Sequence, residues 1–150
     1  MGSAIQVRAA IEKDAQQIAG LSSQLGYTLS VDDTMRNIIA IDKSNFDMAY
    51  VAVMNGQVVG WIHVFYTMRL ETGPFCEIGG LVVDAGSRGK GIGRQLVEKA
   101  KKWAAERNSS RLRVRCQVKR TDAHAFYTRT GFEEKKEQKV FEYIIPGESK

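Results

Sequence analysis

A glycine-rich turn between an apolar strand and a long amphipathic helix constrains this chain more than any other feature of its sequence. Apolar residues at positions 81–83 precede glycines at 86, 89, 91 and 93, and apolar residues then recur at helical spacing up to position 104. The first amides of a helix have no partner inside the helix and lie at the positive end of its dipole. Glycines let a ligand approach such amides closely. We therefore expect a phosphate or pyrophosphate here, with charge-assisted hydrogen bonds from Arg88, Lys90 and Arg94.

Two common phosphate-binding loops do not fit this turn. A Walker loop needs a lysine at the position that Ile92 occupies. A dinucleotide-binding Gly-x-Gly-x-x-Gly pattern needs a final glycine where this chain has Arg94 or Leu96, depending on the starting glycine. The pattern that does fit is Arg-x-x-Gly-x-Gly, which runs from Arg88 to Gly93.

Turn and cap residues divide the rest of the chain into strands and helices. Asn55-Gly56 is a strong hairpin signal. Gly26 and Gly131 stand where left-handed caps would end helices, and Ser30 stands where another helix would begin. The expected strands cover residues 5–10, 49–54, 58–66, 75–84, 112–116 and one or two segments within 132–145. Because hairpins come first and strand–helix–strand units follow, we expect an α/β (α+β) fold with a mixed sheet and helices on both faces.

The composition is that of an ordinary soluble globular protein. Apolar residues make up 43% and charged residues 26% of the 150 residues, enough for a core without disulfides. No run of 18 apolar residues is present, so we expect no membrane span. Cys76 and Cys116 are too few for a disulfide framework, and no cluster has the spacing of a metal site. We therefore expect a single domain over residues 1–150, a cytoplasmic location and no metal.

The charge of the chain is concentrated in one segment. The net charge is +5, but the segment from Gly86 to Arg120 contains twelve basic residues, opposed only by Glu98 and Glu106. Such an asymmetry indicates an anionic partner. Nucleic acid, an acidic membrane surface and a phosphorylated small molecule all remain open on this evidence.

A second pattern follows the glycine-rich turn along the chain. The segment Asp122-Ala123-His124-Ala125-Phe126-Tyr127-Thr128-Arg129-Thr130-Gly131-Phe132 contains Ala-x-x-Phe-Tyr-x-x-x-Gly-Phe. In their order and separation, the two patterns resemble the GNAT superfamily of acyl-CoA-dependent N-acetyltransferases. The resemblance implies a mostly antiparallel twisted sheet of about six or seven strands with helices on both faces. It also implies transfer of an acetyl group from acetyl-CoA to a primary amine, by direct attack in a ternary complex.

The resemblance further implies which residues hold acetyl-CoA. The pyrophosphate would lie on the loop amides, and the pantetheine arm would pair like a strand with the backbone of residues 81–83. Arg120 stands where the family often has an asparagine that binds the pantetheine. The implied cofactor-binding residues are Leu81, Val82, Val83, Arg88, Gly89, Lys90, Gly91, Ile92, Gly93, Arg94, Arg120, Ala123 and Tyr127.

Two residues are candidates for the proton transfers. A free alkyl amine, with a pKa near ~10.4, is almost entirely protonated at pH 7, so the reaction needs a base. The resemblance implies Glu77 as the general base, directly or through water, and Tyr127 as the general acid. Glu133, His63 and water alone are the other candidates for the base.

Two consecutive glycines interrupt the strand that leads into the turn. Glycine weakens a strand, so Gly79-Gly80 indicates a β-bulge, a close backbone approach or a helix packed closely over the strand. Strict alternation would place Glu77, Leu81 and Val83 on one face. The thioester oxygen implied by the resemblance also needs donors, and a backbone N–H at the bulge, near Leu81 or Val82, would serve.

The acceptor is less constrained than the cofactor. Family members position acceptors with the connection between the first two helices and with the hairpin and C-terminal strands, so Tyr27 and Tyr66 are candidate substrate contacts. Residues 12–77 contain eight acids and four bases, which favours a cationic amine. The acceptor would be a small molecule or a peptide, and the resemblance implies a homodimer.

Two functions from other classes are also compatible with this sequence. A nucleic-acid-binding protein could use the basic residues of 86–120, although no aromatic platform alternates with them. A non-catalytic sensor could bind CoA with the same loop and acetylate nothing.

Overall fold

The computed structural model describes residues 4–116 and 120–147, and the chain divides into two compact units, residues 1–115 and 116–150. The first unit contains a five-stranded sheet in the order β1-β2-β3-β4-β5. Its strands are β1 (Gln6–Ala9), β2 (Asp47–Met54), β3 (Gln57–Arg69), β4 (Gly73–Val83) and β5 (Leu112–Val114). The first four strands pair antiparallel, and β4 and β5 pair parallel, so the expected mixed sheet is confirmed.

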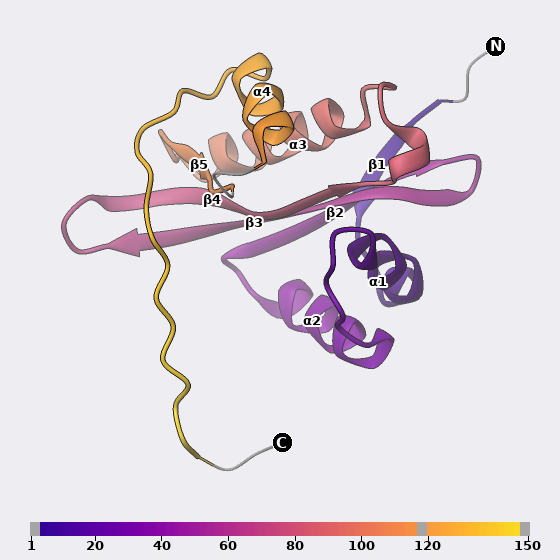
Figure 1. Cartoon of the computed structure of the whole chain (residues 1–150), viewed down its shortest axis with the longest axis horizontal. Helices are drawn as coiled ribbons and strands as arrows, with labels where there is room; N and C mark the ends of the chain where they lie inside the picture. Colours follow the sequence, from indigo (N-terminus) through magenta and orange to yellow (C-terminus); the bar gives the residue numbers. More distant parts are fainter. Residues whose placement is uncertain (1–3, 117–119, 148–150) are drawn as a thin grey trace. The chain divides into compact units, whose positions relative to one another are not determined.

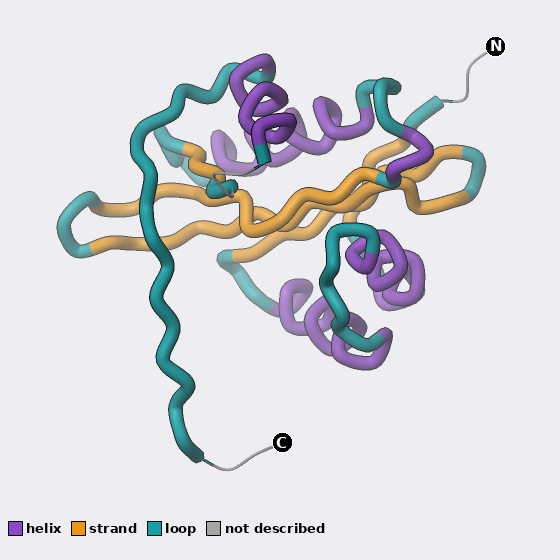
Figure 2. Tube along the Cα trace, in the orientation of Figure 1, coloured by secondary structure: helices purple, strands orange, loops and turns teal. Residues whose placement is uncertain are grey.

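Helices of this unit lie on both faces of the sheet, as expected. The helices α1 (Ala15–Ser23) and α2 (Val31–Lys43) lie on one face, and α3 (Ile92–Glu106) lies on the other (Figures 1 and 2). Two short 3₁₀ helices, η1 (Glu12–Asp14) and η2 (Ala85–Ser87), precede α1 and α3. No helix among the described residues is long and apolar enough to span a membrane.

The local signals of the sequence act where they were expected. Asn55 and Gly56 both have positive φ, 53° and 75°, and they join β2 to β3 as a hairpin. Ser30 caps α2, because its side chain accepts a hydrogen bond from the amide of Asp33 at 3.0 Å.

The core lies between α1, α2 and the sheet, with a second apolar layer under α3. On the first face, side chains of α1 and α2 pack against Val51, Val58 and Val82. On the second face, the hydrophobic side of α3 is buried, and a Cβ added to Gly60 would stand 3.1 Å from atoms of Ile92 and Leu96. The close packing of α3 on β3 therefore needs glycine at this position.

The second unit contains one helix, α4 (Thr121–Arg129), and no strand among its described residues. Gly131, with φ of 101°, follows the end of α4, as the sequence predicts. The one or two strands expected within 132–145 are not formed, so the prediction of six or seven strands is wrong for the described chain. A strand needs a partner for its backbone groups, and a β-rich run of residues alone does not supply one.

Candidate functional site

The glycine-rich turn forms an uncapped helix N-terminus. Gly91 is the N-cap of α3, with φ of 83°, and no side chain of the described residues accepts a hydrogen bond from the first turn of the helix. Gly89 also has positive φ, 81°, and a Cβ added at either glycine would meet no atom within 4 Å. The side chains of Arg88, Lys90 and Arg94 are exposed around these amides. The turn therefore offers unpartnered N–H groups, positive charge and open space, the combination that binds a phosphate group.

The turn is anchored from α1 by contacts that the sequence does not reveal. The side-chain amide of Gln24 donates to Asp84 Oδ1 at 2.9 Å, and its oxygen accepts from the amide of Ala85 at 2.9 Å. Ser87 Oγ donates to Asp84 Oδ2 at 3.1 Å. The hydrogen bond from Gln24, and then that from Ser87, lower the pKa of the Asp84 carboxyl. These bonds hold the turn at the end of β4, and no local pattern predicts a contact sixty residues apart.

The strand before the turn has one unpaired edge. On its β3 side, β4 is paired along its length. On its other side it pairs with β5 at residues 76–78 alone, and no described strand pairs with residues 79–83 there. The main chain of Leu81, Val82 and Val83 is therefore available to an extended ligand that adds as a strand. This is where the pantetheine arm is expected.

A β-bulge at Gly79 separates the two halves of β4. His63 pairs with Gly80, and Val64 pairs with Ile78, so Gly79 is the extra residue. Side chains of β3 also crowd the two glycines. A Cβ at Gly79 would lie 2.9 Å from His63 Nδ1, and a Cβ at Gly80 would lie 2.8 Å from the ring of Trp61. The expected β-bulge and the expected close approach to the strand are thus both present. The side chains that crowd the two glycines come from β3 and not from a helix.

The bulge changes which residues share a face. Glu77 lies opposite Phe65, on the face that α1 and α2 cover, whereas Leu81 and Val83 lie on the α3 face. The prediction that Glu77, Leu81 and Val83 share a face is therefore wrong. One inserted residue reverses the alternation, and nothing in the run 77–83 shows at which residue this happens.

Glu77 is a buried carboxylate with one unused oxygen. The residue is 8% exposed. Its Oε2 lies 3.5 Å from Arg115 Nε, and its Oε1 has no hydrogen-bond partner in the described chain. A buried carboxylate oxygen without a partner is costly unless something donates to it. The position suits an incoming ammonium group or a water molecule.

His63 and Asp47 form a second polar pair on the same face. A hydrogen bond of 2.8 Å joins His63 Nε2 to Asp47 Oδ2, and Ser44 Oγ donates to Asp47 Oδ1 at 2.9 Å. His63 Nδ1 faces the Gly79 bulge. The His63 ring is therefore held by Asp47 and turns Nδ1 toward the Gly79 bulge.

Tyr127 belongs to the second unit, where it packs among aromatic rings. Its ring centroid lies 5.1 Å from that of Phe126 and 5.6 Å from that of Phe132, both edge-on. Burial raises the pKa of Tyr127 to about 12, with a smaller raising effect from Cys116 and a lowering effect from Arg120. Tyr127 therefore keeps its proton at neutral pH. Arg120 stands at the N-terminus of α4, and Ala123 lies in its first turn.

The other candidate residues divide as follows. Tyr27, in the connection between α1 and α2, is 60% exposed and accessible. Tyr66 lies on the α3 face by strand alternation, opposite the face of Glu77, and its ring stacks with Phe46 at 6.2 Å. Glu133 is exposed in the second unit, and His124 lies on α4. No group of three potential metal ligands occurs among residues 4–116 and 120–147.

Comparisons with known proteins agree with this arrangement. Residues 15–132 match the acetyltransferase (GNAT) family. The streptothricin acetyltransferase of Escherichia coli is 33% identical over 106 residues, which are 70% of this chain and 59% of that protein. The aminoalkylphosphonate N-acetyltransferase of Salmonella typhimurium is 35% identical over 85 residues, 56% of this chain and 55% of that protein. The chain thus spans little more than half the length of these relatives.

A solved structure shares the fold over nearly the whole chain. The aminoglycoside N-acetyltransferase AAC(6')-Iy, in complex with CoA, aligns with a TM-score of 0.86 over 95% of this chain and 97% of that one, at 18% identity. At 18% identity, this similarity shows a shared fold and no more. The family match is independent of it and includes both the glycine-rich turn and the second pattern. The chain belongs to the GNAT acetyltransferase family.

Proposed function

We propose that this chain is an N-acetyltransferase domain over residues 1–150 that moves an acetyl group from acetyl-CoA to a primary amine of a small molecule. One observation carries the proposal: the uncapped N-terminus of α3 directly follows the unpaired edge of β4. Together they offer a site for a pyrophosphate and a site for an extended arm, in the order in which CoA carries them. The named relatives act on small amines, which favours a small acceptor over a protein.

The residues at the turn fit CoA in charge and in space. The amides of Gly89 to Arg94 would bind the pyrophosphate, with Arg88 and Lys90 beside them, and the open space at Gly89 and Gly91 leaves room for it. The backbone of residues 81–83 would pair with the pantetheine arm. In the second unit, Arg120, Ala123 and Tyr127 are the further contacts that the family resemblance implies. Acetyl-CoA, when bound, supplies the acetyl group as a thioester.

Glu77 is the base that we favour for the acceptor amine. Its unused Oε1 can accept a proton from an ammonium group, directly or through water, and Arg115 keeps the other oxygen occupied. The neutral amine then attacks the thioester in a ternary complex. His63 is the alternative base, because Asp47 orients its ring and Nδ1 faces the bulge. A backbone N–H beside the bulge, near Leu81 or Val82, would stabilise the oxygen on which negative charge develops.

The family resemblance implies Tyr127, in the second unit, as the general acid for the departing thiolate, and its raised pKa fits a hydrogen-bond donor better. A tyrosine with a pKa of about 12 keeps its proton throughout neutral pH and can therefore always donate. An ordinary thiol has a pKa of about 8.5, well below that of Tyr127. Full transfer of the tyrosine proton to the thiolate would therefore require the bound cofactor to lower the pKa of Tyr127. The role of general acid thus needs a change in the environment of Tyr127, whereas hydrogen bonding needs none.

A homodimer in the cytoplasm is part of the proposal. At least three-quarters of the surface of each of five apolar residues in the second unit is exposed, namely Val140, Phe141, Tyr143, Ile144 and Ile145. A strand from this run would gain both burial and backbone partners against a second copy. Analytical ultracentrifugation should show a dimer that Phe141→Glu converts to a monomer. Both cysteines are free thiols, in keeping with a reducing compartment.

Thermal unfolding with titrated ligands tests the cofactor site. Acetyl-CoA and CoA should each raise the melting temperature, since a ligand at 100 times its Kd adds roughly 2.7 kcal/mol of stability. Gly91→Glu places a carboxylate on the anion site and should abolish the shift. Gly56→Glu is the matched control, because Gly56 also has positive φ and open space but lies in the β2–β3 hairpin. It should lose stability from the same backbone strain and keep the full shift.

Two outcomes would contradict the proposal, one from this titration and one from an acetylation assay. If saturating acetyl-CoA leaves the melting temperature of the unmodified chain unchanged, the acetyltransferase assignment fails. If acetyl-CoA binds but no amine from a broad panel releases free thiol, the chain is a sensor of CoA rather than an enzyme.

A further inference from the structure

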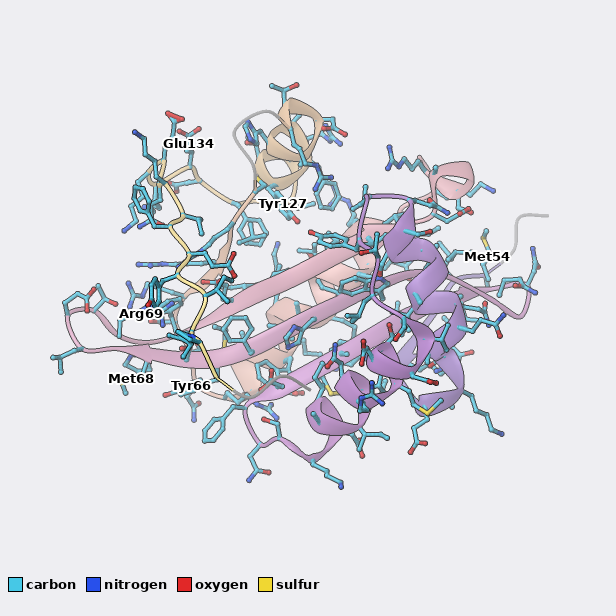
Figure 3. The ribbon with its side chains drawn as sticks, turned by 60° about the horizontal axis from the view of Figure 1, so that its bottom comes forward. Met54, Tyr66, Met68, Arg69, Tyr127 and Glu134 are labelled. Carbon is cyan, nitrogen blue, oxygen red and sulfur yellow. The ribbon has the colours of Figure 1, made fainter. Side chains whose placement is uncertain are left out.

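Three arginines surround a single buried ring on the face of the sheet that carries Glu77. The guanidinium carbons of Arg69, Arg111 and Arg113 lie 5.4, 5.5 and 4.4 Å from the ring centroid of Phe75. They come from β3, from the residue before β5, and from β5 itself. Arg69 stands beside Met68 at the far end of β3, where both are labelled in Figure 3. The fold thus brings three positive charges together on one aromatic platform.

None of these three arginines has a carboxylate partner in the described chain. Arg111 donates to the carbonyl oxygen of Thr72 at 2.8 Å, and Arg69 donates to Thr67 Oγ1 at 3.1 Å. Arg113 has the ring of Phe75 as its contact. All three are half-buried, so their mutual repulsion is screened less than it would be on an open surface. Most of their N–H donors have no partner among the described residues, and an anion would satisfy them.

The arginine cluster lies next to the proposed base. Phe75 and Glu77 are two residues apart on one strand and share a face, and Arg113 pairs directly across from Glu77. Two residues along a strand span about 7 Å. Arg115, the next basic residue on the same side, is already held by Glu77. The face therefore presents a carboxylate for an ammonium group, and arginines for an anion a short distance beyond it.

We propose that Arg69, Arg111 and Arg113 form a subsite for an anionic group of the acceptor, so that the acceptor is a short primary amine that ends in a phosphonate or phosphate. Three guanidiniums match a dianion with three oxygens better than they match a single carboxylate. Arginine binds phosphate and phosphonate oxygens through paired N–H donors. The proposal rests on the acetyltransferase function and names its substrate class. It opposes the cationic acceptor expected from the acid balance of residues 12–77.

Three of the eight acids behind that expectation have ion-pair partners in the structure. Asp14 pairs with Arg8, Asp33 pairs with Arg36, and Asp47 pairs with His63. They do not combine into an acidic surface around Glu77. The unbalanced charge at this site is positive, and a polycation would have to approach three arginines.

The first test measures binding without turnover. The full chain, saturated with CoA, is titrated with 2-aminoethylphosphonate, with propylamine as a monoamine that lacks an anionic group, and with spermidine as a polycation. The phosphonate should raise the melting temperature further and bind more tightly than the other two. In Arg113→Met, which keeps an apolar contact with Phe75 and removes the charge, the affinity for the phosphonate should fall about 10- to 100-fold. Lys102→Gln, an exposed charge removal on α3, is the matched control and should leave the affinity unchanged.

The second test uses steady-state acetylation of the same amines. Arg113→Met and Arg69→Met should raise KM for the phosphonate by the same factor and lower kcat/KM for the phosphonate relative to that for propylamine. The shift in melting temperature with CoA must persist in both variants, which shows that the fold and the cofactor site are intact.

The outcomes separate this proposal from the function on which it rests. If spermidine or another cationic amine is acetylated more efficiently than the phosphonate, or if Arg113→Met leaves phosphonate binding unchanged, the anionic subsite is refuted and the acetyltransferase assignment stands. If acetyl-CoA itself does not bind, both proposals fall together.

Discussion

Replacing Gly80 by alanine should destabilise the chain, and the size of the effect follows from one contact. A Cβ at this position would lie 2.8 and 2.9 Å from two ring atoms of Trp61. The indole cannot move freely, because its Nε1 donates to Ser22 Oγ at 3.2 Å. Overpacking of this kind typically costs 1–3 kcal/mol. For a chain of this size, that corresponds to a fall in melting temperature of about 2 to 12 °C.

Two further variants make this prediction specific to the ring. Gly20 lies in α1 with nothing within 4 Å of an added Cβ, so Gly20→Ala should stabilise the chain by about 0.5–1 kcal/mol. Trp61→Phe shortens the ring, so the penalty for Gly80→Ala should shrink in that background, which a double-mutant cycle of chemical unfolding measures. If Gly80→Ala unfolds at the same temperature as the unmodified chain, or if its penalty is the same with phenylalanine at 61, the steric argument is wrong.

Three more predictions concern the site. Glu77→Gln should lower kcat by about 10²- to 10⁴-fold with the acetyl-CoA shift intact, whereas exposed Glu12→Gln should change neither; an unchanged rate would move the role of base to His63. Gln24→Ala removes two hydrogen bonds from the turn and should weaken acetyl-CoA binding about 3- to 10-fold in the thermal titration, and unaltered binding would mean that the turn holds its shape without α1. The raised pKa of Tyr127 adds stability that is complete below pH 10 and is lost as the pH rises to about 12, because the unfolded tyrosine ionises first. Denaturant unfolding from pH 9 to 12 should therefore show a smaller decline for Tyr127→Phe than for the unmodified chain, and parallel declines would argue against the shift.

Local sequence signals predicted the elements of this fold well. Asn55-Gly56 fixes a hairpin because both residues must adopt positive φ, and Ser30 fixes the start of α2 because its oxygen accepts from a helix amide. Each of these signals depends on residues within one turn of the chain, so a sequence alone contains the whole interaction.

The features that the sequence did not reveal depend on pairing across the fold. The contact of Gln24 with Asp84 joins α1 to the end of β4, and no spacing rule predicts it. The prediction of final strands within 132–145 was wrong for a related reason. A β-rich composition indicates a strand, but it does not show with which strand it would pair. The arginines around Phe75 come from three separate segments, and nothing in the sequence shows that they meet on one ring.

The bulge at Gly79 shows how one residue decides the chemistry that a face can perform. With strict alternation, Glu77 would share the α3 face with Leu81 and Val83. The extra residue places Glu77 on the opposite face, where Arg115 binds one of its oxygens. The unpaired edge of β4 begins at the same residue. The bulge therefore joins the edge proposed for the acetyl donor to the face proposed for the acceptor, and a glycine is needed there because His63 leaves no room for a side chain.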